Sequence, residues 1–454
     1  MTPGGNRWRL EVPANRWDLV PARGPQPVSV IICYYEAPED LRRLIASLDA
    51  QTLPPHQIVV ADDGSTEAPA KDVLRDRPDV LCVWQPDRGF RAGAARNLGA
   101  AAATGDVMVF LDADVVAAPS CLRHLAALPS TQPQSLTVGR RLHARLDGMA
   151  PDQAAALARK PHSRPDRLLP APRWLEEGYA ATADLSRIDV RSWRYVISAV
   201  MAMDRDYFSA VGGFEERLVG YGGEDWELAH RVLHDGGLLA HESRAVVVHN
   251  GPDLSGRPDA LRLKDLETMR LFALITDRTF RPQAVRFATP RVLATVHADQ
   301  WSPESLLTTV DSLLACQPDT AVQIRGWPEL PAVLSHDKRI VASPAEIDHA
   351  HAEVGVDVHQ PVLFDPAFNG AMALVDPGGC GWVSVMVNQR PAVTVTGLWA
   401  KRRCDRIEPA GAAAVRRARA VIGRTSLPPE QAGVMPVPTD TTLEALFDRG
   451  RGAP

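Results

Sequence analysis

Four short apolar runs, separated by stretches with helical periodicity, limit the fold of this chain more than any other feature. The runs are rich in Val, Ile, Leu and Phe and cover residues 28–33, 57–61, 80–84 and 107–111. Such runs are typical of strands buried on both faces of a sheet. Between them, residues 38–48 place Leu and Ile on one helical face, and alanine-rich residues 92–103 predict another helix. This alternation predicts an α/β fold with a parallel sheet between helices.

Acidic residues directly follow two of the predicted strands. Asp62-Asp63-Gly64-Ser65 follows the second run, and Asp112-Ala113-Asp114 follows the fourth. In open α/β sheets, ligands bind beyond the carboxyl ends of the strands. We therefore expect both acidic segments to border one cleft.

The segment Asp112-Ala113-Asp114 has the chemistry of a metal site. Two carboxylates one residue apart on a turning backbone can face one pocket, and Mg²⁺ or Mn²⁺ prefers oxygen ligands. A bound ion would neutralise charge on a leaving nucleotide. A turn capped by Asp side chains is the alternative for an isolated match. His249, at the end of a short predicted strand over residues 245–248, is a candidate further ligand, although a lone histidine is usually structural.

Residues 87–99 combine glycines with arginines ahead of and within a predicted helix. Glycine permits close backbone approach, and Arg91 and Arg96 can form bidentate contacts to phosphate. The segment has no Walker-type Lys-Ser/Thr pair and no strict GxGxxG, which disfavours P-loop and dinucleotide-binding proteins. Asp62 and Asp63 can accept hydrogen bonds from a base or ribose, or form an ordinary turn.

Two glycines precede an acidic helix start at Gly222-Gly223-Glu224-Asp225-Trp226, and the helix is predicted over residues 224–234. Glycines let an acceptor approach the backbone, and a carboxylate there can act as a general base for a hydroxyl. The alternative is that both acids only complement the helix dipole.

Composition excludes several classes of function. The net charge is -5, with 45% hydrophobic and 23% charged residues, which gives no sign of a general affinity for nucleic acid. The six cysteines form no CxxC pair, which disfavours a zinc knuckle. No run approaches a membrane span and no signal peptide is visible, so we expect a cytoplasmic protein, with peripheral membrane contact left open. The scarcity of lysine relative to arginine favours a bacterial, G+C-rich source.

The length of 454 residues predicts two domains. We expect a proline-rich, extended arm over residues 1–27, a nucleotide-binding domain over 28–285, and a C-terminal α/β domain of unknown role over 290–454. The second half contains a faint repeat of the first, with Pro38 matching Pro303 and Leu48 matching Leu313. The repeat lacks an Asp-x-Asp motif, so duplication and chance agreement both remain open.

Taken together, these motifs resemble the family 2 glycosyltransferases with a GT-A fold. The matching segments occur in the expected order over residues 28–275. The acidic helix start also resembles the acceptor-side motif of chondroitin-polymerase-type and β-1,4-galactosyltransferase-type enzymes. The segments are Val28–Cys33, Asp62–Ser65, Gly93–Gly99, Asp112–Asp114 and Gly222–Asp225.

The resemblance implies a role for each matched residue. Asp63 would contact the base, and Asp114 would bind the metal with His249 and Asp112. Asp225 would be the catalytic base, and Glu224 would bind sugar hydroxyls. The implied acceptor-binding residues are Gly222, Gly223 and Trp226, and the implied nucleotide-sugar-binding residues are Cys33, Tyr35, Glu36, Asp63, Arg91, Arg96, Asp112 and Ala113.

The implied reaction is a metal-assisted single displacement that inverts the anomeric centre. The donor would be a nucleoside diphosphate sugar, with UDP favoured and TDP or GDP open, and the acceptor a hydroxyl of a glycan, natural product or lipid. The Gln-x-x-Arg-Trp motif of processive synthases is absent, which favours transfer of single sugars. A homodimer remains open. The alternatives are a sugar-phosphate nucleotidyltransferase and a non-catalytic protein that only binds a nucleotide sugar.

Overall fold

The computed structural model describes residues 10–21, 24–253, 259–282, 285–327, 329–341, 351–407, 409, 411–437 and 442. Parts of the predicted arm, and the end of the predicted C-terminal domain, lie outside these residues. The chain forms two compact units. The first domain comprises Met1–Leu233 with Gly237–Leu271, and the second comprises His234–Gly236 with Phe272–Pro454.

The first domain is built on a mixed sheet with strand order β3-β2-β1-β4-β8-β6-β9-β5, and β7 pairs with β6. The first four strands in this order run parallel, as the sequence predicts. Then β8 is antiparallel to β4 and to β6, β6 is parallel to β9, and β5 is antiparallel to β9. The strands are β1 (Val28–Tyr34), β2 (Gln57–Asp62), β3 (Val80–Trp84), β4 (Val107–Asp112), β5 (Val115–Ala117), β6 (Ser135–Ala144), β7 (Leu168–Leu169), β8 (Val200–Asp204) and β9 (Leu238–Asn250).

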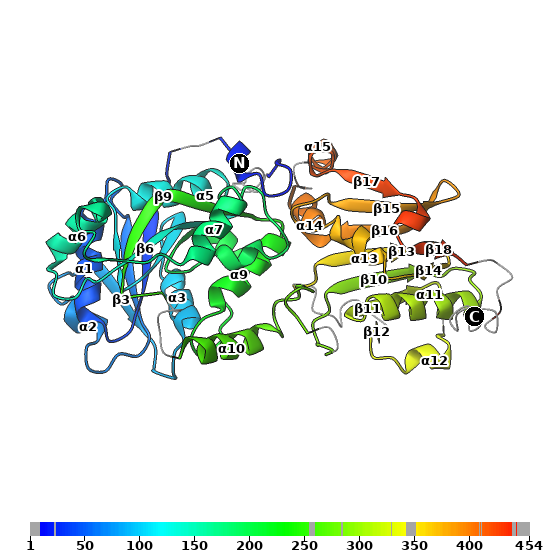
Figure 1. The fold of residues 1–454 in the computed structure, drawn as a ribbon, viewed down its shortest axis with the longest axis horizontal. Helices are drawn as coiled ribbons and strands as arrows, with labels where there is room; N and C mark the ends of the chain where they lie inside the picture. The colour runs from blue at the N-terminus through cyan, green and yellow to red at the C-terminus, as the bar shows by residue number, and fades with distance from the viewer. Residues whose placement is uncertain are drawn as a thin grey trace. The chain divides into compact units, whose positions relative to one another are not determined.

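Helices cover both faces of this sheet because its central strands are apolar on both sides. Val30, Ile31 and Ile32 of β1 are all fully buried. In Figure 1, α1 and α6 lie on one side of the sheet, and α3 and α9 on the other. The helices are α1 (Pro38–Asp49), α2 (Ala70–Val73), α3 (Ala92–Ala101), α4 (Cys121–Leu125), α5 (Ala127–Thr131), α6 (Pro151–Arg159), α7 (Arg173–Ala181), α8 (Arg205–Ala210), α9 (Glu224–His234) and α10 (Ala260–Leu271).

Residues 130–192, interpreted from the sequence as an irregular loop with short helices, contain the central strand β6. Its side chains alternate between polar and apolar, and two consecutive arginines, Arg140 and Arg141, obscure the pattern. The strand forms because β8 and β9 pair with its two edges. This long-range pairing cannot be read from local propensity.

The predicted N-terminal arm is anchored to the first domain where it is described. Leu10 and Val12 pack against Leu238, and the buried amide of Asn15 donates hydrogen bonds to the carbonyls of Leu185 and Leu239. A short 3₁₀ turn follows at Trp17–Leu19. The arm is therefore less extended than its prolines suggest.

The second domain has a seven-stranded sheet with order β12-β11-β10-β13-β16-β15-β17. The first four strands are parallel, β16 is antiparallel to β13 and β15, and β17 is parallel to β15. A separate pair joins β14 and β18. The strands are β10 (Val292–His297), β11 (Thr320–Arg325), β12 (Ile340–Val341), β13 (Val354–Val358), β14 (Val362–Phe364), β15 (Trp382–Val387), β16 (Arg390–Gly397), β17 (Arg424–Leu427) and β18 (Val434–Pro436).

The order and the directions of the strands in this sheet match those of β3-β2-β1-β4-β8-β6-β9 in the first domain, strand for strand. The helix after the first strand begins at a proline in each case, Pro38 in α1 and Pro303 in α11. These are the two positions that the faint sequence repeat superimposes. The shared order supports a duplication.

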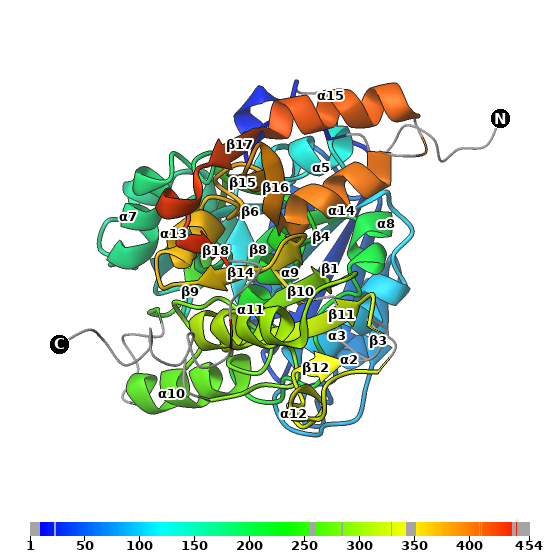
Figure 2. The ribbon, with the colours of Figure 1, turned by 90° about the vertical axis from the view of Figure 1, so that its right-hand side faces the viewer.

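Helices of the second domain pack in two places. Leu306, Val310 and Leu313 of α11 join the main core with the apolar face of the sheet. Figure 2 shows α14 and α15 side by side, away from α11, where Trp399 and Ala418 belong to a smaller core. The helices are α11 (Pro303–Cys316), α12 (Ala332–Ser335), α13 (Phe368–Ala373), α14 (Leu398–Ile407) and α15 (Ala412–Ile422).

Candidate active site

A cavity of about 520 Å³ opens at the carboxyl ends of β1, β2 and β4 in the first domain. This is the edge at which ligands of α/β sheets bind. The cavity brings together most of the donor-side residues predicted from the sequence. Its lining includes Cys33, Tyr35, Asp63, Arg96, Asp112, Ala113, Asp114 and His249.

Asp114 and His249 form a pair because β5 and β9 are antiparallel neighbours, with Val115 opposite His249. His249 Nε2 lies 3.1 Å from Asp114 Oδ2. Burial would raise the pKa of the Asp114 carboxyl, but the hydrogen bond and charge of His249 outweigh it and lower this pKa. The second carboxylate oxygen, Oδ1, is buried and accepts no hydrogen bond from any residue in the described ranges.

That donor set suits a hard divalent cation. A carboxylate oxygen without a partner beside an imidazole nitrogen offers two ligand atoms, and a phosphate and water can supply the rest. The carboxylate of Asp112 is directed elsewhere, to Arg96. Asp114 and His249 are therefore the stronger ligand candidates, and Asp112 is the weaker one.

Arg96 links the two acidic motifs. It lies on α3, is almost completely buried, and donates to Asp112 at 2.6 Å and to Glu224 at 2.8 Å. Burial of the guanidinium opposes its charge, but the two carboxylates outweigh burial and raise the pKa of Arg96. Glu224 is not among the described residues lining the cavity, and this ion pair connects it to the cavity.

Asp225 is a half-buried carboxylate at the start of α9. Its Oδ2 accepts a hydrogen bond of 3.2 Å from the backbone N–H of Ser198. Burial raises the pKa of Asp225 to about 7, and the carboxylates of Glu224 and Glu267 act in the same direction. A carboxylate with that pKa can accept a proton near neutral pH, as a general base must.

Asp63 is held by its neighbours. Its carboxylate accepts hydrogen bonds from the backbone N–H of Arg91 at 2.9 Å and from Gln85 at 2.6 Å. Asp62, beside it, accepts hydrogen bonds from the backbone N–H groups of Ser65 and Ala70. Asp62 therefore organises the turn, and Asp63 lines the cavity.

Two predicted donor-binding residues do not line this cavity. The carboxylate of Glu36 accepts hydrogen bonds from the backbone N–H groups of Thr66, Glu67 and Ala68. For Arg91, the interaction found is the backbone hydrogen bond to Asp63. Both positions organise the loops around the cavity.

Several lining residues were missed by sequence reasoning. Arg141 comes from β6, which the sequence did not reveal, and lies 3.1 Å from Asp253. Asp87 and Phe90 belong to a segment that was singled out for its glycines and arginines. Phe90 also contacts Tyr221, with ring centroids 5.6 Å apart. These aromatic side chains give one wall of the cavity an apolar surface.

The predicted acceptor side has one feature that limits stacking on Trp226. The ammonium of Lys264 lies 3.3 Å from the centroid of the Trp226 ring, and Trp193 packs edge-on at 5.5 Å. A sugar could stack on the face covered by Lys264 only if that ammonium moved. Sugar stacking on Trp226 stays a prediction, and these contacts support the alternative role of an anchor for the helix start.

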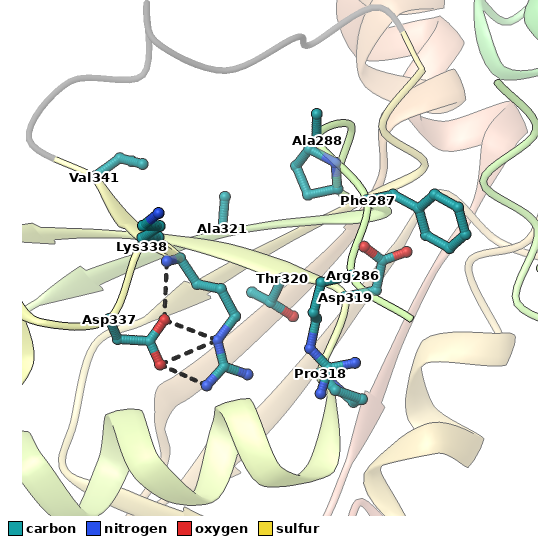
Figure 3. A pocket seen from close by; sticks show the side chains of 12 residues that line it. Arg286, Phe287, Ala288, Pro318, Asp319, Thr320, Ala321, Asp337, Lys338 and Val341 are labelled. Atoms are coloured by element: carbon teal, nitrogen blue, oxygen red, sulfur yellow. Dashed lines mark hydrogen bonds and ion pairs between the residues drawn. The ribbon is translucent and has the colours of Figure 1, made fainter. Parts of the chain in front are cut away.

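A second cavity, of about 590 Å³, lies in the second domain. Figure 3 shows Asp337, Lys338 and Asp319 around it, at the amino ends of β11 and β12. Its two acids are paired, because Arg339 pairs with Asp337 and Arg281 pairs with Asp319. This cavity lies at the amino ends of the strands, away from the edge where ligands of such sheets bind.

Comparison with known families agrees with the site geometry. Residues 29–179 match the model of glycosyl transferase family 2, and residues 177–244 match the N-terminal domain of galactosyltransferase. The match to glycosyl transferase family 2 lies within the first domain. The GT-A fold predicted for it agrees with this family and with the mixed sheet. The second match includes Gly222–Asp225, the segment that resembled galactosyltransferases.

Curated proteins that are similar to the first domain include proteins named as glycosyltransferases. A validoxylamine A glucosyltransferase from Streptomyces hygroscopicus subsp. limoneus is 33% identical over 234 residues, covering 48% of this chain and 50% of that protein. Hyaluronan synthase from Pasteurella multocida is 25% identical over 239 residues, covering 50% of this chain and 24% of that protein. The match spans half or less of each relative.

Among solved structures, GalNAc-T7 with UDP, GalNAc and Mn²⁺ aligns with a TM-score of 0.37 and 20% identity, covering 50% of this chain and 44% of that chain.

No described helix is long and apolar enough to cross a membrane.

Proposed function

We propose that the chain is an inverting glycosyltransferase that moves a sugar from a nucleoside diphosphate to a hydroxyl acceptor, with Mg²⁺ or Mn²⁺ as cofactor. The main support is Asp225, a carboxylate with a raised pKa of about 7, linked by Glu224 and Arg96 to the cavity that contains Asp114. UDP is the first choice of nucleotide, from the family resemblance. The proposed catalytic domain is the span 28–285 expected from the sequence, although the first compact unit ends at Leu271 and the residues from Phe272 belong to the second.

In this reaction Asp225 accepts the proton of the acceptor hydroxyl. The acceptor oxygen then bonds to the anomeric carbon as the bond from that carbon to the diphosphate oxygen breaks. The nucleoside diphosphate leaves with the bonding electrons, and a single displacement inverts the anomeric centre. A divalent cation held by Asp114 and His249 would offset the charge of the diphosphate.

The other residues bind and orient the substrates. Arg96 holds Asp112 and Glu224 in fixed positions, so both carboxylates are set before substrate binds. Asp63 faces the cavity where a base would lie, with its orientation set by Gln85 and Arg91. The apolar wall of Phe90 and Tyr221 suits the face of a base or sugar ring.

The decisive variant is Asp225→Asn, which keeps the side-chain shape and removes the proton acceptor. We expect turnover to fall at least about a hundredfold, because general base catalysis contributes roughly 10²–10⁴-fold. Donor binding, measured as the thermal shift caused by nucleoside diphosphate with Mn²⁺, should persist. The matched control is Asp152→Asn, the same change on the exposed surface of α6, which should leave turnover intact.

The product separates the alternatives. A glycosyltransferase releases nucleoside diphosphate from a nucleotide sugar, whereas a nucleotidyltransferase releases pyrophosphate from a nucleoside triphosphate. A protein that only binds nucleotide sugars releases neither. Wild-type-like turnover by Asp225→Asn would overturn the assigned mechanism.

A further inference from the structure

Helix α10 closes over the turn that precedes Asp225. Arg270 donates hydrogen bonds to the carbonyls of Val219 and Tyr221, the latter at 2.8 Å. The helix buries two of its residues, Glu267 and Leu271, against this turn. It therefore holds the catalytic segment from outside the motif that sequence reasoning identified.

The two glycines of the motif are required by this packing. Gly222 and Gly223 have φ values of +79° and +99°, a region that side chains rarely adopt. A Cβ added to Gly222 would lie 2.9 Å from Glu267 Oε2, and one added to Gly223 would lie 3.1 Å from Leu271 Cδ2. The carboxylate of Glu267 thus occupies the space that a side chain at Gly222 would need.

Glu267 is a buried acid, 4% exposed. Its Oε1 accepts a hydrogen bond of 2.8 Å from Lys264, whose ammonium also covers the ring of Trp226. Burial raises the pKa of Glu267, and Lys264 partly offsets this rise. Burial of an ionised acid costs free energy unless a neighbouring group interacts with it. The turn that leads to Asp225 lies directly beside Glu267.

The titratable groups around Asp225 come from four helices, and the uncharged one is Tyr179 of α7. Glu224 neighbours it on α9, Glu267 approaches from α10, and Arg96 on α3 acts with the opposite sign. The backbone N–H of Ser198 donates to its carboxylate. Of the two neighbouring acids, Glu224 is paired with Arg96 and Glu267 is paired with Lys264, each at 2.8 Å. The charge of Glu267 can therefore be changed without breaking the Arg96 network.

We propose that Glu267 is a positioning residue for the catalytic base: α10 sets a second buried carboxylate against the Gly222-Gly223 turn and so tunes the proton affinity of Asp225. The inference rests on the proposed function. A negative charge beside Asp225 makes its carboxylate a stronger base near neutral pH. Glu267 need not contact either substrate in this role.

The test is the pH profile of kcat/KM for Glu267→Gln, an isosteric change that removes the charge. Wild-type kcat/KM should rise with pH through about 7, as Asp225 loses its proton. Removal of Glu267's charge lowers the pKa of Asp225, so the acid limb moves to lower pH. The ratio of kcat/KM near pH 6 to that near pH 8 should increase about threefold. The plateau at high pH should fall, because a less basic carboxylate removes the proton less effectively.

Three further variants distinguish charge from packing. Glu267→Asp restores the charge and should return the limb toward the wild-type position. Asp265→Asn makes the same charge change two residues away, on the exposed side of α10, and should leave the profile unchanged. Leu271→Ala loosens the packing and should lower kcat without moving the limb.

An acid limb in Glu267→Gln that coincides with the wild-type limb would overturn this inference. If Asp225→Asn is inactive in the same assay, the proposed function stands although the inference about Glu267 has failed. If Asp225→Asn is fully active, the proposed function itself has failed.

Discussion

At the scale of single residues, the candidate site depends on a few close contacts between charged side chains. Arg96 forms ion pairs with two carboxylates, Asp112 and Glu224, inside the domain and offsets part of their charge. Asp114 keeps one oxygen without a protein partner in the described ranges, while His249 holds the other. The ion pairs of Arg96 stabilise the site in the absence of ligand. The oxygen of Asp114 that has no protein partner can coordinate a cation.

Asp114→Ala should remove metal-dependent donor binding. A ligand at about one hundred times its Kd stabilises the folded state by about 2.7 kcal/mol. We expect the additional thermal shift that Mn²⁺ gives to UDP to disappear in the variant, since its best oxygen ligand is lost. Asp152→Ala, on the exposed surface of α6, should retain the full shift. An undiminished Mn²⁺ effect in Asp114→Ala would place the ion elsewhere.

At the scale of secondary-structure elements, Gly99 sets how closely α3 approaches the sheet. A Cβ at this position would lie 2.5 Å from Ile31 Cγ2 and 3.3 Å from Ala61 Cβ. Ile31 is fully buried in β1 and has little room to move. Because Arg96 lies one turn earlier on α3, this close contact also places its guanidinium.

We therefore predict opposite effects for two glycine-to-alanine changes in helices. Gly99→Ala overpacks the contact between α3 and β1 and should destabilise the first domain by about 1–3 kcal/mol. A Cβ added at Gly370, in α13, has no neighbouring atom within 4 Å. Gly370→Ala should therefore stabilise the second domain by about 0.4–1 kcal/mol. Urea denaturation of the full chain, with each domain followed by its own tryptophans, measures both. Equal effects at the two sites would contradict the packing argument.

At the scale of the whole molecule, the chain contains two sheets of matching order with different residues at their carboxyl ends. The first has Asp63-Gly64 after β2, whereas the second has Arg325-Gly326 at the end of β11. Gly64 and Gly326 both have positive φ, +97° and +84°. After β13 stand His359 and Gln360, without an Asp-x-Asp motif. The second domain keeps the strand order and the turn, but its described residues at these two positions are not acidic.

This difference predicts that the second sheet's carboxyl end takes no part in transfer. His297 and His359 stack there, with ring centroids 5.0 Å apart. A double variant, His297→Ala with His359→Ala, should keep kcat and the donor KM within about twofold of wild type, the range expected when no transition-state contact is lost. Steady-state kinetics with saturating Mn²⁺ provides the check. A tenfold loss of kcat would assign this end of the sheet a role in the reaction.

Much of the first domain could be predicted because its signals are local. The strands at residues 28–34 and 107–112 are apolar runs, and their ends carry the acids that line the cavity. Strand β6 escaped prediction because its pairing partners are distant in sequence, and with it escaped Arg141. The contact of Glu267 with Gly222 could not be predicted either, because no motif near α10 indicates it.

The order of apolar runs and acidic turns was enough to predict the α/β class and the carboxyl-end cleft, because each follows from neighbouring residues. The same segments carried the resemblance to family 2 glycosyltransferases. The pairing of Asp114 with His249, the double ion pair of Arg96 and the approach of α10 to Gly222 required the folded chain. Arg96 and Glu224, like Asp114 and His249, lie more than a hundred positions apart in the sequence. Helix α10 shares no motif with Gly222. Burial and charge at such contacts depend on which strands and helices become neighbours, and local sequence does not encode that choice.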